Sequence, residues 1–150
     1  MDEARVRQFL IIWLNNNNYD IKHLPPDWGK GPWRTGRGAR HIAPQPPDIY
    51  AKRRSDYPYF YYIEAKGDPP STTKLQTAMG QIRACMGSTA PASYGMAFPM
   101  DFCRIIRDHL SYEAWDGLGA NILLVDDNGE VFELNRSKNN YEWIVANSNR

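Results

Sequence analysis

The chain has 150 residues, of which 42% are hydrophobic, and this fits one folded domain over residues 1–150 with a core of its own. The formal net charge of +1 does not by itself indicate a strongly acidic or basic partner. The strongest apolar run, residues 9–14, falls far short of the roughly 18 residues that a membrane span needs, which argues against a membrane protein.

The first segment predicts an amphipathic helix over residues 2–16. Val6, Leu10 and Trp13 recur every three or four positions and therefore share one face of such a helix. Asp2 favours the N-terminal end of this helix electrostatically. The same acidic start lacks the basic segment of a secretory signal, so we expect a cytoplasmic protein.

Residues 19–47 are rich in Gly, Pro and Trp and predict a long loop, with short strands at residues 21–24 and near residues 40–43. Positive charge accumulates over residues 30–54, where Asp48 is the single acid. This charge could follow a phosphate backbone in a salt-dependent way, or it could belong to a solvated loop, and both interpretations stay open. The loop residues that would contact nucleic acid are Lys30, Arg34, Arg37 and Arg40.

Two strands are predicted next, at residues 48–53 and 59–66, joined by a turn that contains a Ser-Asp-Tyr-Pro sequence. A helix then begins at Ser71 or Thr72, either of which can cap it, and ends near residue 87. Its spacing predicts a buried stripe formed by Leu75, Met79, Ile82 and Met86.

The remaining segments complete an α/β pattern. They predict strands at residues 94–98, 121–125 and 130–134, a helix over residues 101–110, and an edge strand or a short helix at residues 141–145. The order α-β-β-β-α-β-α-β-β predicts a central mixed sheet flanked by helices.

Cys85 and Cys103 fall in separate predicted helices. The sequence has no CxxC motif and no histidine at ligand spacing from either cysteine. We expect reduced thiols, as in a cytoplasmic protein, and no zinc site.

The segment that carries chemistry pairs Asp48 with the strand that contains Glu64 and Lys66. Side chains alternate along a strand, so Glu64 and Lys66 project to the same side. A hairpin centred on residue 56 would place Asp48 opposite Glu64, with Cβ atoms roughly 4.5–5.5 Å apart. A shift of the register by one residue would turn Asp48 to the other face.

Two opposed carboxylates need a cation between or beside them. Lys66 provides one positive charge, and Mg²⁺, Mn²⁺ or Ca²⁺ would suit the oxygen ligands. Such a site can activate water and stabilise the charge that develops on a phosphate group. On spacing alone, an exposed hairpin with an ordinary Glu–Lys face is an equally simple interpretation.

The sequence resembles the PD-(D/E)XK nuclease superfamily, which has the restriction-endonuclease-like fold. The matching residues are Pro47 and Asp48, then the Glu-Ala-Lys-Gly of residues 64–67, then Gly-Gln-Ile at residues 80–82, after a first helix that carries Glu3. The resemblance covers the order of elements from residue 2 to about residue 134.

The resemblance implies a role for each matching residue. Asp48 and Glu64 would bind Mg²⁺ or Mn²⁺ with help from the carbonyl of Ala65, and Lys66 would assist the attacking water. Gln81 would support the site, and Glu3 would contact the metal or its waters. The implied activity is hydrolysis of phosphodiester bonds by a magnesium-dependent nuclease, with DNA as the expected partner.

Two features depart from the superfamily pattern. Cys85 stands where some branches have a tyrosine four residues after the helix glutamine, and the basic loop before Asp48 matches no motif. The alternatives are therefore a catalytically inactive nucleic-acid-binding or assembly module of the same fold, and a subunit of a homodimer or of a nuclease complex.

Overall fold

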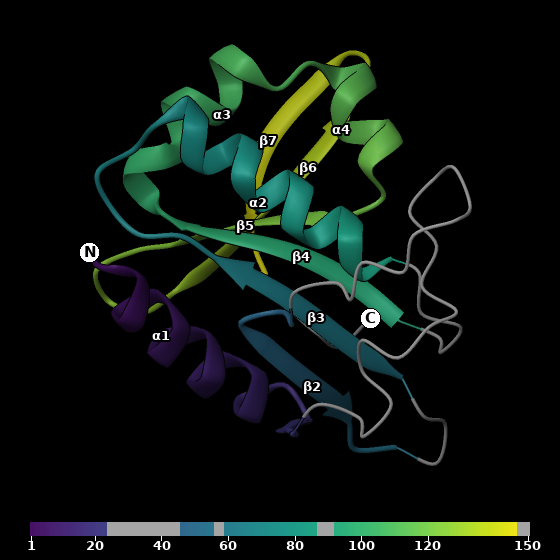
Figure 1. The fold of residues 1–150 in the computed structure, drawn as a ribbon. Coiled ribbons are helices and arrows are strands. Elements are labelled where there is room, and N and C mark those ends of the chain that lie inside the picture. Colours follow the sequence, from purple (N-terminus) through teal and green to yellow (C-terminus); the bar gives the residue numbers. More distant parts are fainter. Residues whose placement is uncertain (24–45, 56–58, 87–91, 147–150) are drawn as a thin grey trace.

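The computed structural model describes residues 1–23, 46–55, 59–86 and 92–146 (Figure 1). Seven strands form one sheet, and helices cover both of its faces. The elements in chain order are α1 (Glu3–Asn16), β1 (Tyr19–Ile21), β2 (Ile49–Arg53), β3 (Phe60–Ala65), α2 (Thr72–Cys85), β4 (Ala92–Pro99), the 3₁₀ turn η1 (Met100–Phe102), α3 (Cys103–His109), α4 (Tyr112–Leu118), β5 (Asn121–Val125), β6 (Val131–Ser137) and β7 (Asn140–Val145).

The strands follow one another across the sheet in chain order, from β1 to β7. The central strands β3, β4 and β5 are parallel, whereas β1, β2, β6 and β7 pair with their neighbours in antiparallel fashion. The connection from β3 to β4 contains α2, as a parallel crossover requires. The sheet is therefore mixed, as the sequence predicted.

Two hydrophobic cores lie on the two faces of the sheet. On one face α1 packs through Val6, Leu10 and Leu14. On the other face α2 and α3 pack against side chains such as Tyr62 and Phe98 (Figure 1). Because side chains alternate along β3, Ile63 and Ala65 face α1 while Tyr62 and Glu64 face the α2 side.

Capping residues define where the main helices begin. The Asp2 side chain accepts a hydrogen bond from the backbone N–H of Arg5 at 2.8 Å, and Ser71 does the same for Lys74 at 3.1 Å. These bonds satisfy N–H groups that have no partner within the first helical turn. The predicted start of the second helix at Ser71 or Thr72 is therefore confirmed.

The structure corrects the predicted positions of several elements. β1 lies two residues earlier than the predicted strand at residues 21–24, and the predicted strand near residues 40–43 lies outside the described residues. α4 was not predicted. The tail forms strand β7 rather than a short helix.

The buried stripe of α2 also differs from the prediction. Leu75 and Ile82 are buried as expected, but the fully covered positions beside them are Ala78 and Cys85, while Met79 and Met86 are only partly buried. The small side chains of Ala78 and Cys85 let α2 lie close to the sheet, and the larger methionines flank this contact.

Both cysteines are free, Cys85 on α2 and Cys103 on α3. Within the described part of the chain, no helix combines the length and the apolar character that crossing a bilayer would require.

Candidate active site

The hairpin of β2 and β3 brings Asp48 opposite Glu64. Ile49 pairs with Ile63 and Tyr50 with Tyr62, so the same register, extended by one residue, sets Asp48 against Glu64. The predicted register is thus confirmed. The backbone N–H of Ala65 donates to Oδ2 of Asp48 at 2.8 Å, which holds this carboxylate at the end of the hairpin.

Glu64 is the buried charged residue of this site, with 2% of its surface exposed. Burial, the negative charge of Asp48 and a hydrogen bond between the two side chains raise the pKa of Glu64 to about 8, against the smaller opposing effect of Lys66. A proton or a cation is therefore needed where these two acids meet. Without one of them, the buried Glu64 carboxylate would lie directly against the negative charge of Asp48.

Lys66 follows directly after β3, on the same side of the chain as Glu64. Its backbone N–H donates to the carbonyl of Ala97 on β4 at 2.9 Å, so the backbone stays paired beyond the end of the strand. The next turn is held by Lys74, whose Nζ donates to the carbonyls of Gly67 and Pro69 at 2.9 and 3.0 Å. The Lys66 amine is therefore carried by an anchored segment.

Helix α2 contributes two side chains to the Glu64 side of the sheet. Burial and the negative charges of Glu64 and Asp48 raise the pKa of Cys85 to about 12, which shows that this thiol senses the acid pair. Gln81 lies one helical turn before Cys85, on the same face of α2. Its Oε1 is buried and has no hydrogen-bond partner among the described residues, so it is an acceptor that still needs a donor.

Glu3 lies in the first turn of α1, which packs tightly against the loop after Lys66. A Cβ atom at Gly67 would lie 2.3 Å from the backbone nitrogen of Glu3, so only glycine allows this contact. Among the described residues, no ion pair or hydrogen bond joins the Glu3 side chain to Asp48 or Glu64. The expected role of Glu3 beside a metal stays a prediction.

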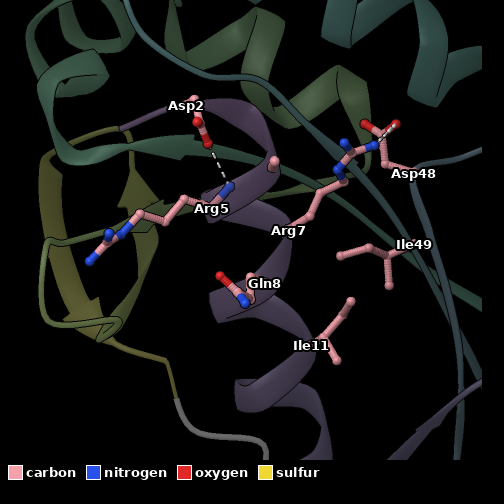
Figure 2. Close-up of a pocket in the computed structure, with 8 residues that line it drawn as sticks. Asp2, Arg5, Arg7, Gln8, Ile11, Asp48 and Ile49 are labelled. Carbon is pink, nitrogen blue, oxygen red and sulfur yellow. Dashed lines mark hydrogen bonds and ion pairs between the residues drawn. The ribbon is translucent and has the colours of Figure 1, made fainter.

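Arg7, one turn after Glu3, makes the contact that the sequence did not reveal. Its Nη1 lies 3.8 Å from Oδ1 of Asp48. Figure 2 shows the Arg7 side chain reaching from α1 to Asp48. The spacing of four residues between Glu3 and Arg7 places both on one helix face and is the sequence signal that could have indicated Arg7.

An open groove of about 590 Å³ runs between α1 and the start of β2. Arg7 and Asp48 lie at one side of it, and Figure 2 shows Gln8, Ile11 and Ile49 along the rest. The Arg5 guanidinium points away from Asp48 and lies over the ring of Phe9, 5.2 Å from its centroid. Arg7 is thus the cation on the acid-pair side of the groove.

The donor set matches a hard divalent cation only in part. Asp48 and Glu64 provide two carboxylates, but the described residues contain no group of three or more His, Cys, Asp or Glu side chains able to hold a metal ion. Further ligands would have to be backbone carbonyl, water or substrate oxygens, which Mg²⁺ commonly accepts. The predicted nucleic-acid contacts at Lys30, Arg34, Arg37 and Arg40 lie outside the described residues.

A comparison with solved structures finds a similar fold in an XisH family protein from Nostoc punctiforme. The two chains share 16% sequence identity with a TM-score of 0.55, and the match covers 93% of this chain and 98% of the other. No protein-family model and no curated protein sequence matches this chain. The predicted architecture, a central mixed sheet flanked by helices, is confirmed, and the comparison shows the fold alone.

Proposed function

We propose that this protein is a Mg²⁺- or Mn²⁺-dependent nuclease that hydrolyses phosphodiester bonds, with DNA as its substrate. The observation that carries the proposal is the burial of Glu64 directly against Asp48, with Lys66 next along the same side of the strand. A fold that buries one carboxylate directly against a second gains no stability from the pair, which supports a chemical use for it.

The two carboxylates would suit a hard cation that completes its coordination with backbone, water or substrate oxygens. Asp48 and Glu64 would hold it, and the carbonyl of Ala65, between Glu64 and Lys66, is the expected third protein ligand. Oxygen donors of this kind select Mg²⁺ or Mn²⁺ over softer metals. When bound, such an ion lowers the pKa of a coordinated water and stabilises charge on the phosphate.

The protein groups around the pair have distinct tasks. Lys66 would orient the attacking water and stabilise negative charge that develops on the phosphate oxygens, which its anchored backbone favours. The Oε1 of Gln81 is buried and has no partner within the part of the chain that the structure describes, and it would accept a hydrogen bond from a water or from substrate at the site. Asp48 needs no further positioning, because the Ala65 N–H already holds it.

The second candidate is a nucleic-acid-binding or assembly module of the same fold that does not cut. The ion pair between Arg7 and Asp48 favours it, because this guanidinium already provides the acids with a positive charge from the protein itself. Such a module would bind DNA without taking up a divalent ion.

A cleavage assay separates the two. Plasmid and single-stranded DNA are incubated with the wild-type protein in Mg²⁺, in Mn²⁺ and in EDTA, beside Lys66→Ala and the control Lys138→Ala, an exposed lysine in the turn before β7. We expect cleavage that needs the metal, is lost by about 100-fold or more in Lys66→Ala, and is unchanged in Lys138→Ala.

Calorimetry with Mn²⁺ accompanies the assay. Uptake of the ion by the wild type and by Lys66→Ala would support the nuclease. DNA binding without cleavage or metal uptake would support the module, and equal cleavage by Lys66→Ala would remove Lys66 from the mechanism.

A further inference from the structure

The groove beside α1 contains a basic side chain placed next to the acid pair. Arg7 is 41% exposed while Asp48 is 21% exposed, so the guanidinium lies between solvent and the carboxylate. The ion pair joins Nη1 of Arg7 to Oδ1 of Asp48 at 3.8 Å, which is longer than a hydrogen bond between charged groups. The contact is a loose ion pair, and most of the donors of Arg7 stay available to another anion.

The other oxygen of Asp48 is already engaged. Oδ2 accepts the Ala65 N–H at 2.8 Å, so Arg7 is not required to hold the carboxylate in place. The role of Arg7 at Asp48 is to neutralise charge. Because the pair is loose, a phosphate can compete with Asp48 for the guanidinium in the absence of metal, and a divalent cation at the acid pair would favour the exchange further.

We propose that the groove seats the sugar–phosphate backbone of a nucleic-acid strand, and that Arg7 exchanges its ion pair with Asp48 for a phosphate of that strand. This inference rests on the proposed function, because it takes nucleic acid as the ligand. Arg7 is then a substrate-binding residue that holds the phosphate beside Asp48 and Glu64.

The chemistry of the groove fits this ligand. A guanidinium presents planar, paired donors that match phosphate oxygens, and it stays charged at all physiological pH values. Gln8 adds a polar amide on the same helix, and Ile11 and Ile49 form an apolar floor suited to the sugar rather than to a second charge (Figure 2). A phosphate bound by Arg7 would lie beside Asp48, where hydrolysis is proposed.

The test measures DNA binding without cleavage. A fluorescein-labelled single strand is titrated with protein in EDTA at several salt concentrations, and binding is followed by anisotropy. We expect Arg7→Gln to weaken binding about tenfold and to lower the salt slope by about 1, as expected for one lost phosphate contact. Arg7→Lys, which keeps the charge but not the paired donors, should keep the salt slope of the wild type and recover only part of the affinity.

Arg104→Gln is the matched control. It removes the same charge, but Arg104 lies on α3, which packs on the other face of the sheet, and its side chain is 90% exposed. Its affinity should stay within about threefold of the wild type, since general attraction by one exposed charge is weak at physiological salt. Circular dichroism of each variant confirms the fold, and Mn²⁺ affinity of Arg7→Gln should be equal to or tighter than that of the wild type.

The outcomes separate this inference from the nuclease proposal. If the wild type binds and cuts DNA while Arg7→Gln binds as well as the wild type, or no worse than Arg104→Gln, the groove inference is wrong and the nuclease stands. If Arg7→Gln binds tenfold more weakly but no protein takes up Mn²⁺ or cuts, the groove is supported and the nuclease is overturned. A wild type that binds no DNA overturns both.

Discussion

Asp48 and Glu64 face each other across the β2–β3 hairpin with their carboxyl groups hydrogen-bonded, and the N–H of Ala65 donates to Asp48 on the same edge at 2.8 Å. Glu64 is buried, whereas Asp48 is reached by Arg7. The two acids therefore differ in environment, and Glu64 is the one that holds a proton when no metal is bound. Several measurable properties depend on this difference.

The stability of the metal-free protein should fall as the pH rises. The pKa of Glu64 is raised to about 8 in the folded state from a value of 4.5 for the free side chain, so between these values the folded state binds more protons than the unfolded state. The free energy of unfolding then decreases through this window. Urea unfolding in EDTA between about pH 5 and pH 8 measures it. Glu64→Gln should flatten the profile, and an equally steep profile in this variant would contradict the assignment.

Divalent metal should restore the stability that the metal-free protein loses as the pH rises. Deprotonated Glu64 is the form that binds a cation, so Mn²⁺ should raise Tm more at pH 8 than at pH 6. At 100 times its Kd, a ligand that binds only the folded state adds about 2.7 kcal/mol, which shifts the Tm of a chain of this size by roughly 5–10 °C. Scanning calorimetry gives the shift. Glu64→Gln should show none, and a shift of equal size in that variant would place the ion elsewhere.

Asp48→Asn should lower the pKa of Glu64 and weaken metal binding. The amide oxygen can still accept the Ala65 N–H, but the negative charge that opposes ionisation of Glu64 is gone. We expect the pH-dependent loss of stability to be smaller than in the wild type and to level off at lower pH, and Mn²⁺ affinity to fall by about tenfold or more. Calorimetric titration measures the affinity. Unchanged Mn²⁺ binding would show that Asp48 is no ligand.

Gly67→Ala should destabilise the fold and displace α1 from the loop after Lys66. The added Cβ would lie 2.3 Å from the nitrogen of Glu3 and 2.7 Å from the carbonyl carbon of Asp2, and backbone atoms cannot move aside cheaply. We expect a loss of about 2–3 kcal/mol in urea unfolding.

Gly80→Ala is the matched control for that substitution. Gly80 is exposed in the interior of α2, and a Cβ there meets no atom within 4 Å. The change should increase stability by about 1 kcal/mol, because alanine is the better helix former. Equal effects of the two substitutions would mean that the contact between Gly67 and α1 is not tight.

Local patterns were sufficient to predict the hairpin and its acids. The alternation of β3 and the turn chemistry between the strands fixed the register, and Ser71 marked the start of α2. α4 was not predicted, because Leu118 is its one buried residue. Its seven residues therefore show no apolar side chains at helical spacing. Its ends are nonetheless set by Ser111, whose side chain caps Ala114, and by Gly119 with a φ of 68°.

Features that depend on how elements pack could not be read from the sequence. The spacing of α2 predicts a stripe that includes Met79 and Met86, whereas close approach to the sheet selects Ala78 and Cys85. The contact of Arg7 with Asp48 joins residues 41 positions apart on different elements. Only the placement of α1 across the sheet brings them together.

The burial of Glu64 against Asp48 lowers the stability of the metal-free protein, so selection for stability alone acts against this pair of acids. Neutralising either acid would relieve the repulsion between them and make the metal-free fold more robust. Directed evolution for heat resistance alone, in a chelating medium, would therefore enrich substitutions at these two positions first. Variants recovered in that way would be more stable to heat and would lack the proposed metal site at Asp48 and Glu64.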